Sequence, residues 1–136
     1  MADIIVGYDG SECARAALDT AITAAAALGD SLVVVYAYEV SRLGGEVEDY
    51  AKALKERSDE VISHATHQAQ AKGIEIETTV AEVDPATALV EIADERDARI
   101  IVVGTRGDHP LKAAIIGSVP HKLLQVTDRP VLVVPA

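Results

Sequence analysis

Four small residues in the C-terminal third of the chain have a spacing suited to holding phosphate. Gly104 and Gly107 are followed, after nine residues, by Gly117 and Ser118. Glycine allows a ligand to approach the backbone amides closely because it has no Cβ. Ser118 stands at the start of an apolar, helix-like run, where unpaired N–H groups and the positive end of the helix dipole attract anions. The spacing therefore indicates a phosphate site, although a glycine turn followed by an ordinary helix cap fits the same residues.

Positive charge gathers in the same stretch. Arg106, His109 and Lys112 are candidate phosphate contacts, with Asp108 partly opposing them. The pattern is not a Walker A loop, because no Gly-Lys-Ser/Thr sequence follows a glycine-rich run, and no Gly-x-Gly-x-x-Gly follows the first strand-like segment. A polyphosphate would thus be held mainly by backbone amides.

Composition restricts the partners. The 136 residues carry 12 Lys and Arg against 22 Asp and Glu, a formal net charge of −10, and aromatic residues make up only 3%, without Trp or Phe. Nucleic acid and anionic membranes would be repelled, and the aromatic platforms that stack single-stranded bases are almost lacking. A single cysteine and the lack of a signal-peptide pattern at the N-terminus favour the reducing cytoplasm.

Alternating apolar runs predict a single α/β domain over residues 1–136. Continuous apolar segments indicate buried parallel strands, and the runs between them have helical spacing. Strands are expected at 4–8, 32–38, 74–80, 99–103 and 131–134, and helices at 11–28, about 46–72, from 85, and 119–126. The alternating, partly polar third strand belongs at one edge and the last strand at the other. The predicted order is 3-2-1-4-5.

This order places two turns at one crevice. Asp9 follows the first strand and Gly104 follows the fourth, and the winding of the sheet reverses between these two strands. In open α/β sheets ligands bind beyond the carboxyl ends of the strands at that reversal. The phosphate site is therefore expected there.

With Gly104, Gly107, Gly117 and Ser118 at this spacing, the chain resembles the ATP-binding branch of the universal stress protein family. That branch has the signature Gly-x2-Gly-x9-Gly-Ser/Thr, and the resemblance extends from Ile4–Ser11 to Arg129–Val134. It implies a three-layer, flavodoxin-like sandwich related to the adenine nucleotide alpha hydrolases, which binds ATP or AMP as a nucleotide-dependent regulatory module in the stress response. Mg²⁺ or Mn²⁺ would be held mainly by the phosphates rather than by protein ligands.

The resemblance also assigns residues. It places Asp9 beside the adenosine, Ala37 against the adenine and Gly104 by the ribose. The phosphates would be bound by amides or a hydroxyl of Gly107, Gly117, Ser118 and Val119. One departure is Val83, where many members have the glycine of a Gly-x-Pro turn.

The family also implies a homodimer, and the last strand supplies a physical reason. Val131–Val134 is apolar, uncharged and predicted at a sheet edge, where an uncovered strand tends to pair with another. Two copies related by a two-fold axis would cover each other. A charge introduced by Val133→Glu is expected to release monomers.

Several residues have other interpretations. Asp9 could be a catalytic base, but an Asp before Gly-Ser is more often a turn residue, and contact with the ligand is favoured over both. His109 could relay a proton, although a solvated loop histidine is favoured. His64 and His67 have the spacing of a metal pair but no third ligand, so a solvated helix face is favoured. Cys13 is expected to be buried. A slow ATPase or phosphotransferase is the alternative function, although no base or arginine finger stands out. The residues required for a phospho-receiver or a flavodoxin are not found.

Overall fold

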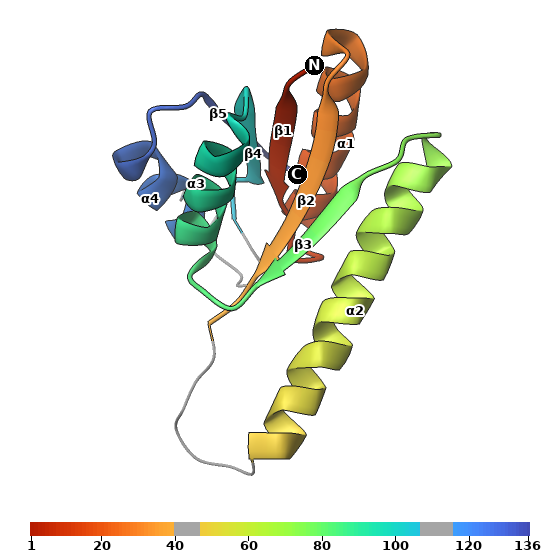
Figure 1. Ribbon diagram of the computed structural model, residues 1–136, viewed down its shortest axis with the longest axis vertical. Helices are drawn as coiled ribbons and strands as arrows, with labels where there is room; N and C mark the ends of the chain where they lie inside the picture. The colour runs from red at the N-terminus through yellow and green to blue at the C-terminus, as the bar shows by residue number, and fades with distance from the viewer. Residues whose placement is uncertain (40–46, 107–115) are drawn as a thin grey trace.

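The computed structural model describes residues 1–39, 47–106 and 116–136, which form a five-stranded sheet in the order β3-β2-β1-β4-β5 (Figure 1). Every neighbouring pair is parallel. The predicted fold class and strand order are confirmed. The strands are β1 Asp3–Gly7, β2 Ser31–Ala37, β3 Glu77–Ala81, β4 Ile100–Gly104 and β5 Val131–Val134.

Helices cover both faces of the sheet, which gives three layers. α1 (Glu12–Leu28) and α2 (Val47–Ala71) lie on one face, and α3 (Pro85–Arg96) and α4 (Ser118–Val126) on the other (Figure 1). Central strands between two helical layers are apolar at every position, because neither face meets water. Thus Ile4 packs with α1 and α2, whereas Ile5 packs with α3 and α4, and both are fully buried.

Both edge strands are more exposed than the centre, as the sequence indicated. β3 presents mostly exposed residues, and β5 has three half-buried residues and an exposed Leu132. β3 begins at Glu77, three residues later than predicted. The difference arises because Gly73 adopts a left-handed φ of 73° and Ile74 donates its N–H to Ala69 O at the end of α2. Ile74 and Ile76 then pack against the core before pairing with β2 starts.

Local signals fix where the helices begin. Ser11 caps α1 by accepting the N–H of Ala14 at 3.1 Å, as the sequence predicted. Asp84 caps α3 in the same way through Thr87, and Pro85 occupies the first helical position, where its missing N–H costs nothing. α4 begins at Ser118, one residue earlier than expected, with Gly117 as its cap. All these starts lie beyond the carboxyl ends of the preceding strands.

Candidate functional site

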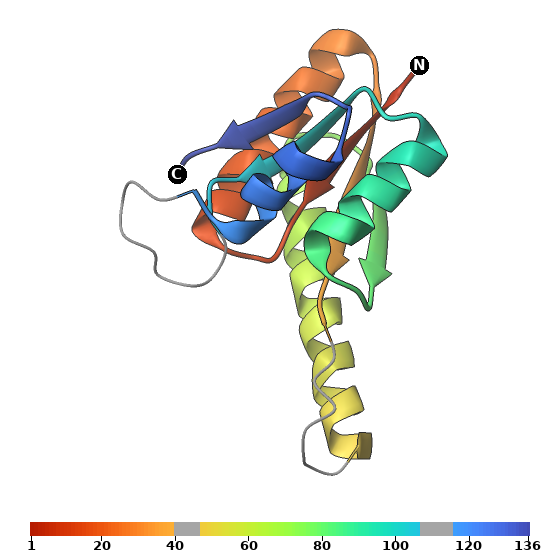
Figure 2. The ribbon, with the colours of Figure 1, turned by 90° about the vertical axis from the view of Figure 1, so that its left-hand side faces the viewer.

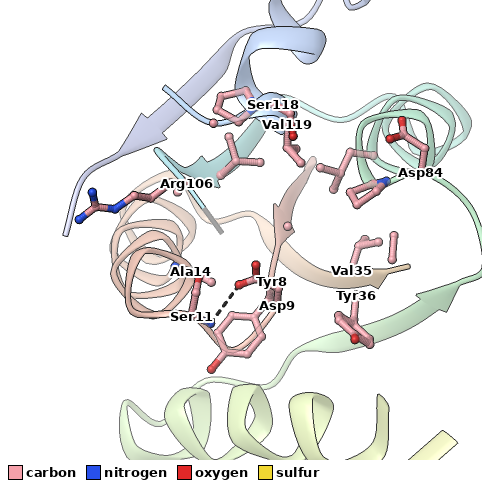
Figure 3. Close-up of a pocket in the computed structure, with 18 residues that line it drawn as sticks. Tyr8, Asp9, Ser11, Ala14, Val35, Tyr36, Asp84, Arg106, Ser118 and Val119 are labelled. Carbon is pink, nitrogen blue, oxygen red and sulfur yellow. Dashed lines mark hydrogen bonds between the residues drawn. The ribbon is translucent and has the colours of Figure 1, made fainter. Parts of the chain in front are cut away.

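A cavity of about 590 Å³ lies at the carboxyl edge of the sheet, where β1 and β4 are neighbours (Figure 3). Its walls are the ends of β1, β2 and β4 and the first turns of α1, α3 and α4. β1 leads through α1 to β2, whereas β4 leads through α4 to β5, so the direction of winding reverses here. The cavity is at the predicted crevice, and its volume suits a small organic ligand.

The structure brings together the predicted site residues that it describes. The cavity is lined by Asp9, Ala37, Gly104, Arg106, Gly117, Ser118 and Val119. Asp9 and Ala37 lie at the ends of β1 and β2, and Gly117, Ser118 and Val119 at the start of α4. Gly107, His109 and Lys112 lie outside the described residues.

The start of α4 presents two backbone donors. Gly117 N–H is already engaged, since it donates to Thr105 O at 2.6 Å, and Pro120 has no N–H. His121 donates to Gly117 O at 3.3 Å, which leaves the amides of Ser118 and Val119 without a partner among the described residues. The cap residue, Gly117, has no side chain and so cannot itself cap the first amides of α4. This end of the cavity is therefore equipped to bind an anion.

The two described glycines of the motif are required by packing against protein rather than only by the approach of a ligand. A Cβ at position 104 would lie 2.7 Å from Cys13 Cβ and 2.8 Å from its carbonyl carbon. At position 117 it would lie 3.1 Å from both Arg106 Cα and Thr105 O. A larger residue at 117 would thus displace the backbone of 105–106 before it could fill a phosphate position.

Asp9 has two roles in the structure. Its Oδ1 accepts the N–H of Ser11 at 2.9 Å, so it shapes the turn between β1 and α1 (Figure 3). It also lines the cavity. The turn is held from outside by Arg15 Nη1, which donates to Gly10 O at 2.9 Å. The interpretation as a turn residue is therefore confirmed, and the place of Asp9 in the cavity wall leaves contact with a ligand a prediction.

Asp84 is a cavity residue that the sequence analysis did not single out. Its Oδ2 accepts from Thr87 N at 3.1 Å and forms an ion pair with Lys122 Nζ at 2.7 Å, which joins α3 to α4. The hydrogen bond from Lys122 is the main cause that lowers the pKa of Asp84 below 3.8. The sequence signal that could have found it is the pair Asp84-Pro85, which follows shortly after β3 ends at Ala81. Val83, two residues before Pro85, is partly buried against the core on the face of the sheet that α3 and α4 cover.

Two tyrosines, Tyr8 and Tyr36, complete the side of the cavity nearest α2 (Figure 3). Tyr8 is 3% exposed, and its hydroxyl has no hydrogen-bond partner within the part of the chain that the structure describes. Burial is the main cause that raises the pKa of this phenol. These aromatic walls were missed because the sequence analysis treated both residues as parts of strands.

The remaining candidates lie away from the cavity or inside the protein. His64, His67 and His121 are exposed on helices, and within the described ranges no group of three His, Cys, Asp or Glu side chains could hold a metal. Cys13 is buried, as predicted. The Thr105 hydroxyl, 3.5 Å from its sulfur, is the main cause that lowers the pKa of the thiol. No helix in the described part of the chain is long and apolar enough to span a bilayer.

Comparison with known proteins finds relatives that match nearly the whole chain. Residues 1–135 match the family model described as the universal stress protein family. Universal stress protein YxiE of Bacillus subtilis is 31% identical over 143 residues, covering 96% of this chain and 97% of its own. A universal stress protein solved in complex with cAMP is 30% identical, with a TM-score of 0.75 over 98% of this chain and 96% of that one. The Archaeoglobus fulgidus protein in complex with dAMP is 26% identical, with a TM-score of 0.75 over 98% of both chains.

Proposed function

Because this chain belongs to the universal stress protein family, we propose that it binds ATP or AMP in the cavity at the β1–β4 edge. In this proposal the protein is a cytoplasmic, nucleotide-dependent regulatory module of the stress response. Occupancy of the cavity would change the surface near the start of α4, which a partner protein would read.

The amides of Ser118 and Val119, which line the cavity and have no partner among the described residues, are the observation that carries the proposal. A protein with a net charge of −10 repels anions overall, so a phosphate needs a local group of donors. The start of α4 supplies these donors together with the positive end of the helix dipole. Support also comes from the relatives solved with cAMP and dAMP, which are both adenine nucleotides.

The walls suggest how the nucleotide would lie. Asp9 and Ala37 would face the adenosine, and Gly104 the ribose, at the ends of three neighbouring strands. Ser118 and Val119 would bind the phosphates, with Arg106 as a further candidate; Gly107, His109 and Lys112, which lie outside the described residues, are candidates from the sequence. Gly117 would act mainly by holding Thr105. Mg²⁺ or Mn²⁺ would be coordinated mainly by phosphate oxygens.

Two measurements test the proposal. Mass spectrometry of the small molecules released on denaturation of the purified protein should identify an adenine nucleotide. Calorimetry should give micromolar dissociation constants for AMP or ATP, roughly −8 kcal/mol. Ser118→Ala should weaken the binding of AMP and of ATP but leave the binding of adenosine unchanged. Ser63→Ala, at an exposed position of α2, is the matched control. The proposal fails if wild-type protein binds none of these ligands.

The alternative is a slow ATPase or phosphotransferase with the same cavity. Turnover of labelled ATP separates the two functions, because a regulatory module holds its nucleotide essentially intact. A rate of about one per second or faster would favour the enzyme.

We further propose that the protein is a homodimer that pairs through β5. β5 is the outermost strand on its side of the described sheet (Figure 2), and Leu132 is 38% exposed on it. Antiparallel pairing of two such strands across a two-fold axis would satisfy their edge N–H and C=O groups.

A further inference from the structure

Thr105 joins three elements of the protein at the end of β4. Its N–H donates to Val134 O at 3.0 Å, and its carbonyl oxygen accepts from Gly117 N at 2.6 Å. Its hydroxyl lies 3.5 Å from Cys13 Sγ. One residue thus contacts the last residue of β5, the cap of α4 and the first turn of α1.

The two backbone contacts determine where α4 begins. The bond to Val134 continues the pairing of β4 with β5, which ends at Gly104 and Val134. The bond to Gly117 then fixes the residue directly before Ser118. The amides of Ser118 and Val119 are therefore aimed by the position of the Thr105 carbonyl.

Only the contact with Cys13 depends on the side chain at position 105. Either atom can donate in this hydrogen bond, and it lowers the pKa of the thiol more than any other contact does. β4 and α1 also pack tightly here, since a Cβ at Gly104 would have no room beside Cys13. The Thr105 hydroxyl thus links the residue after β4 to the first turn of α1.

We infer that Thr105 is a positioning residue for the phosphate end of the nucleotide site. This inference rests on the proposed function and extends it. Thr105 stands between Gly104 and Arg106, which line the cavity, and it acts through Gly117 on the donors of α4. Loss of its hydroxyl removes the contact between Thr105 and Cys13 of α1 and so misaligns the amides of Ser118 and Val119. Binding of the phosphate is then weakened, whereas binding of the nucleoside is not.

The test uses Thr105→Val, which keeps the shape and backbone preference of threonine but removes the hydroxyl. AMP should bind up to about tenfold more weakly, the upper size of one lost neutral hydrogen bond, while adenosine changes by less than about twofold. Thr105→Ser restores the hydroxyl and should recover AMP affinity. In a double-mutant cycle, the variant with both Thr105→Val and Cys13→Ala should lose no more AMP affinity than Thr105→Val alone, because each substitution removes the same hydrogen bond.

A second readout needs no ligand. The Gly117 amide should exchange its hydrogen faster in Thr105→Val, and the thiolate absorbance of Cys13 should appear at higher pH, with both returning in Thr105→Ser. An equal loss for AMP and adenosine would indicate a general structural effect and overturn the inference. It is likewise overturned if wild-type protein binds AMP more tightly than adenosine and Thr105→Val keeps that ratio. Wild-type protein that binds neither ligand would overturn the proposed function as well.

Discussion

Lys122 and Asp84 form an ion pair of 2.7 Å that ties the fourth helix to the cap of the third. The same carboxylate oxygen accepts the N–H of Thr87, so one group both ends the β3–α3 turn and joins two helices at the ligand edge. The stability of this wall therefore depends on the ionisation of a single carboxylate.

Asp84→Ala should destabilise the protein by about 1 kcal/mol through loss of the helix cap, with a further loss of the contact with Lys122. Asp84→Asn keeps the cap and should cost less. Urea unfolding at pH 7 measures both. Equal losses in the two variants would contradict a capping role.

Acid should reduce the contribution of Asp84. Its pKa is lowered in the folded protein from 3.8, so the ionised form stabilises the fold. This stabilisation is fully present above about pH 4 and is lost as the pH falls through the lowered pKa. The difference in stability between wild-type protein and Asp84→Asn should therefore shrink below pH 4. A difference that stays constant as the pH is lowered well below 4 would contradict the assignment.

Gly104→Ala should destabilise the protein by about 1–3 kcal/mol, the usual cost of overpacking. The added Cβ would lie 2.7 Å from Cys13 Cβ and 2.8 Å from its backbone, so Cys13→Gly should not restore full stability. Gly29→Asn is the control: its φ of 70° tolerates Asn, and a Cβ there has nothing within 4 Å. Thermal unfolding compares the variants, and an unaffected Gly104→Ala would show that α1 can move away.

Tyr8→Phe should leave the stability unchanged or raise it by up to about 1 kcal/mol, because the hydroxyl that it removes is buried and no described residue bonds to it. Tyr38→Phe is the comparison, since the Tyr38 hydroxyl donates to Glu82 at 3.2 Å. Chemical denaturation of both variants is the measurement. A clear loss in Tyr8→Phe would indicate an internal water on that hydroxyl.

Leu132→Glu should convert the proposed dimer to monomers, because two like charges would meet across the two-fold axis. The Val133→Glu change suggested by sequence is a poorer test, since Val133 packs against the core and the charge would damage the fold. Leu124→Glu, at an equally apolar but helical position that is 60% exposed, is the control. If sedimentation gives the same value for Leu132→Glu and wild-type protein, the β5 interface is wrong.

The sheet and the place of the cavity were predictable because they depend on local patterns. Runs such as Ile4–Val6 are apolar at every position only when both sides are covered, and the polar alternation of β3 marks an edge. Once the order is known, the reversal between β1 and β4 locates the crevice. Ser11 could be identified as a cap because capping acts over three residues.

The contacts that shape the cavity could not be predicted in this way. Lys122 and Asp84 are 38 residues apart, and Cys13 and Thr105 are 92 apart. Their proximity depends on how α4 packs beside α3 and how α1 lies on β4, which no local pattern specifies. For the same reason the packing role of Gly104 is invisible in the sequence, where its glycine fits a ligand equally well.

The placement of Tyr8 and Tyr36 gives the protein an optical reporter. The chain has no Trp and four Tyr, so its intrinsic fluorescence comes from very few rings, and these two stand in the cavity wall. An adenine ring seated beside them would alter their emission, whereas Tyr50 lies away on α2 and supplies a steady background. Occupancy could thus be followed by light alone, without any label attached to the protein.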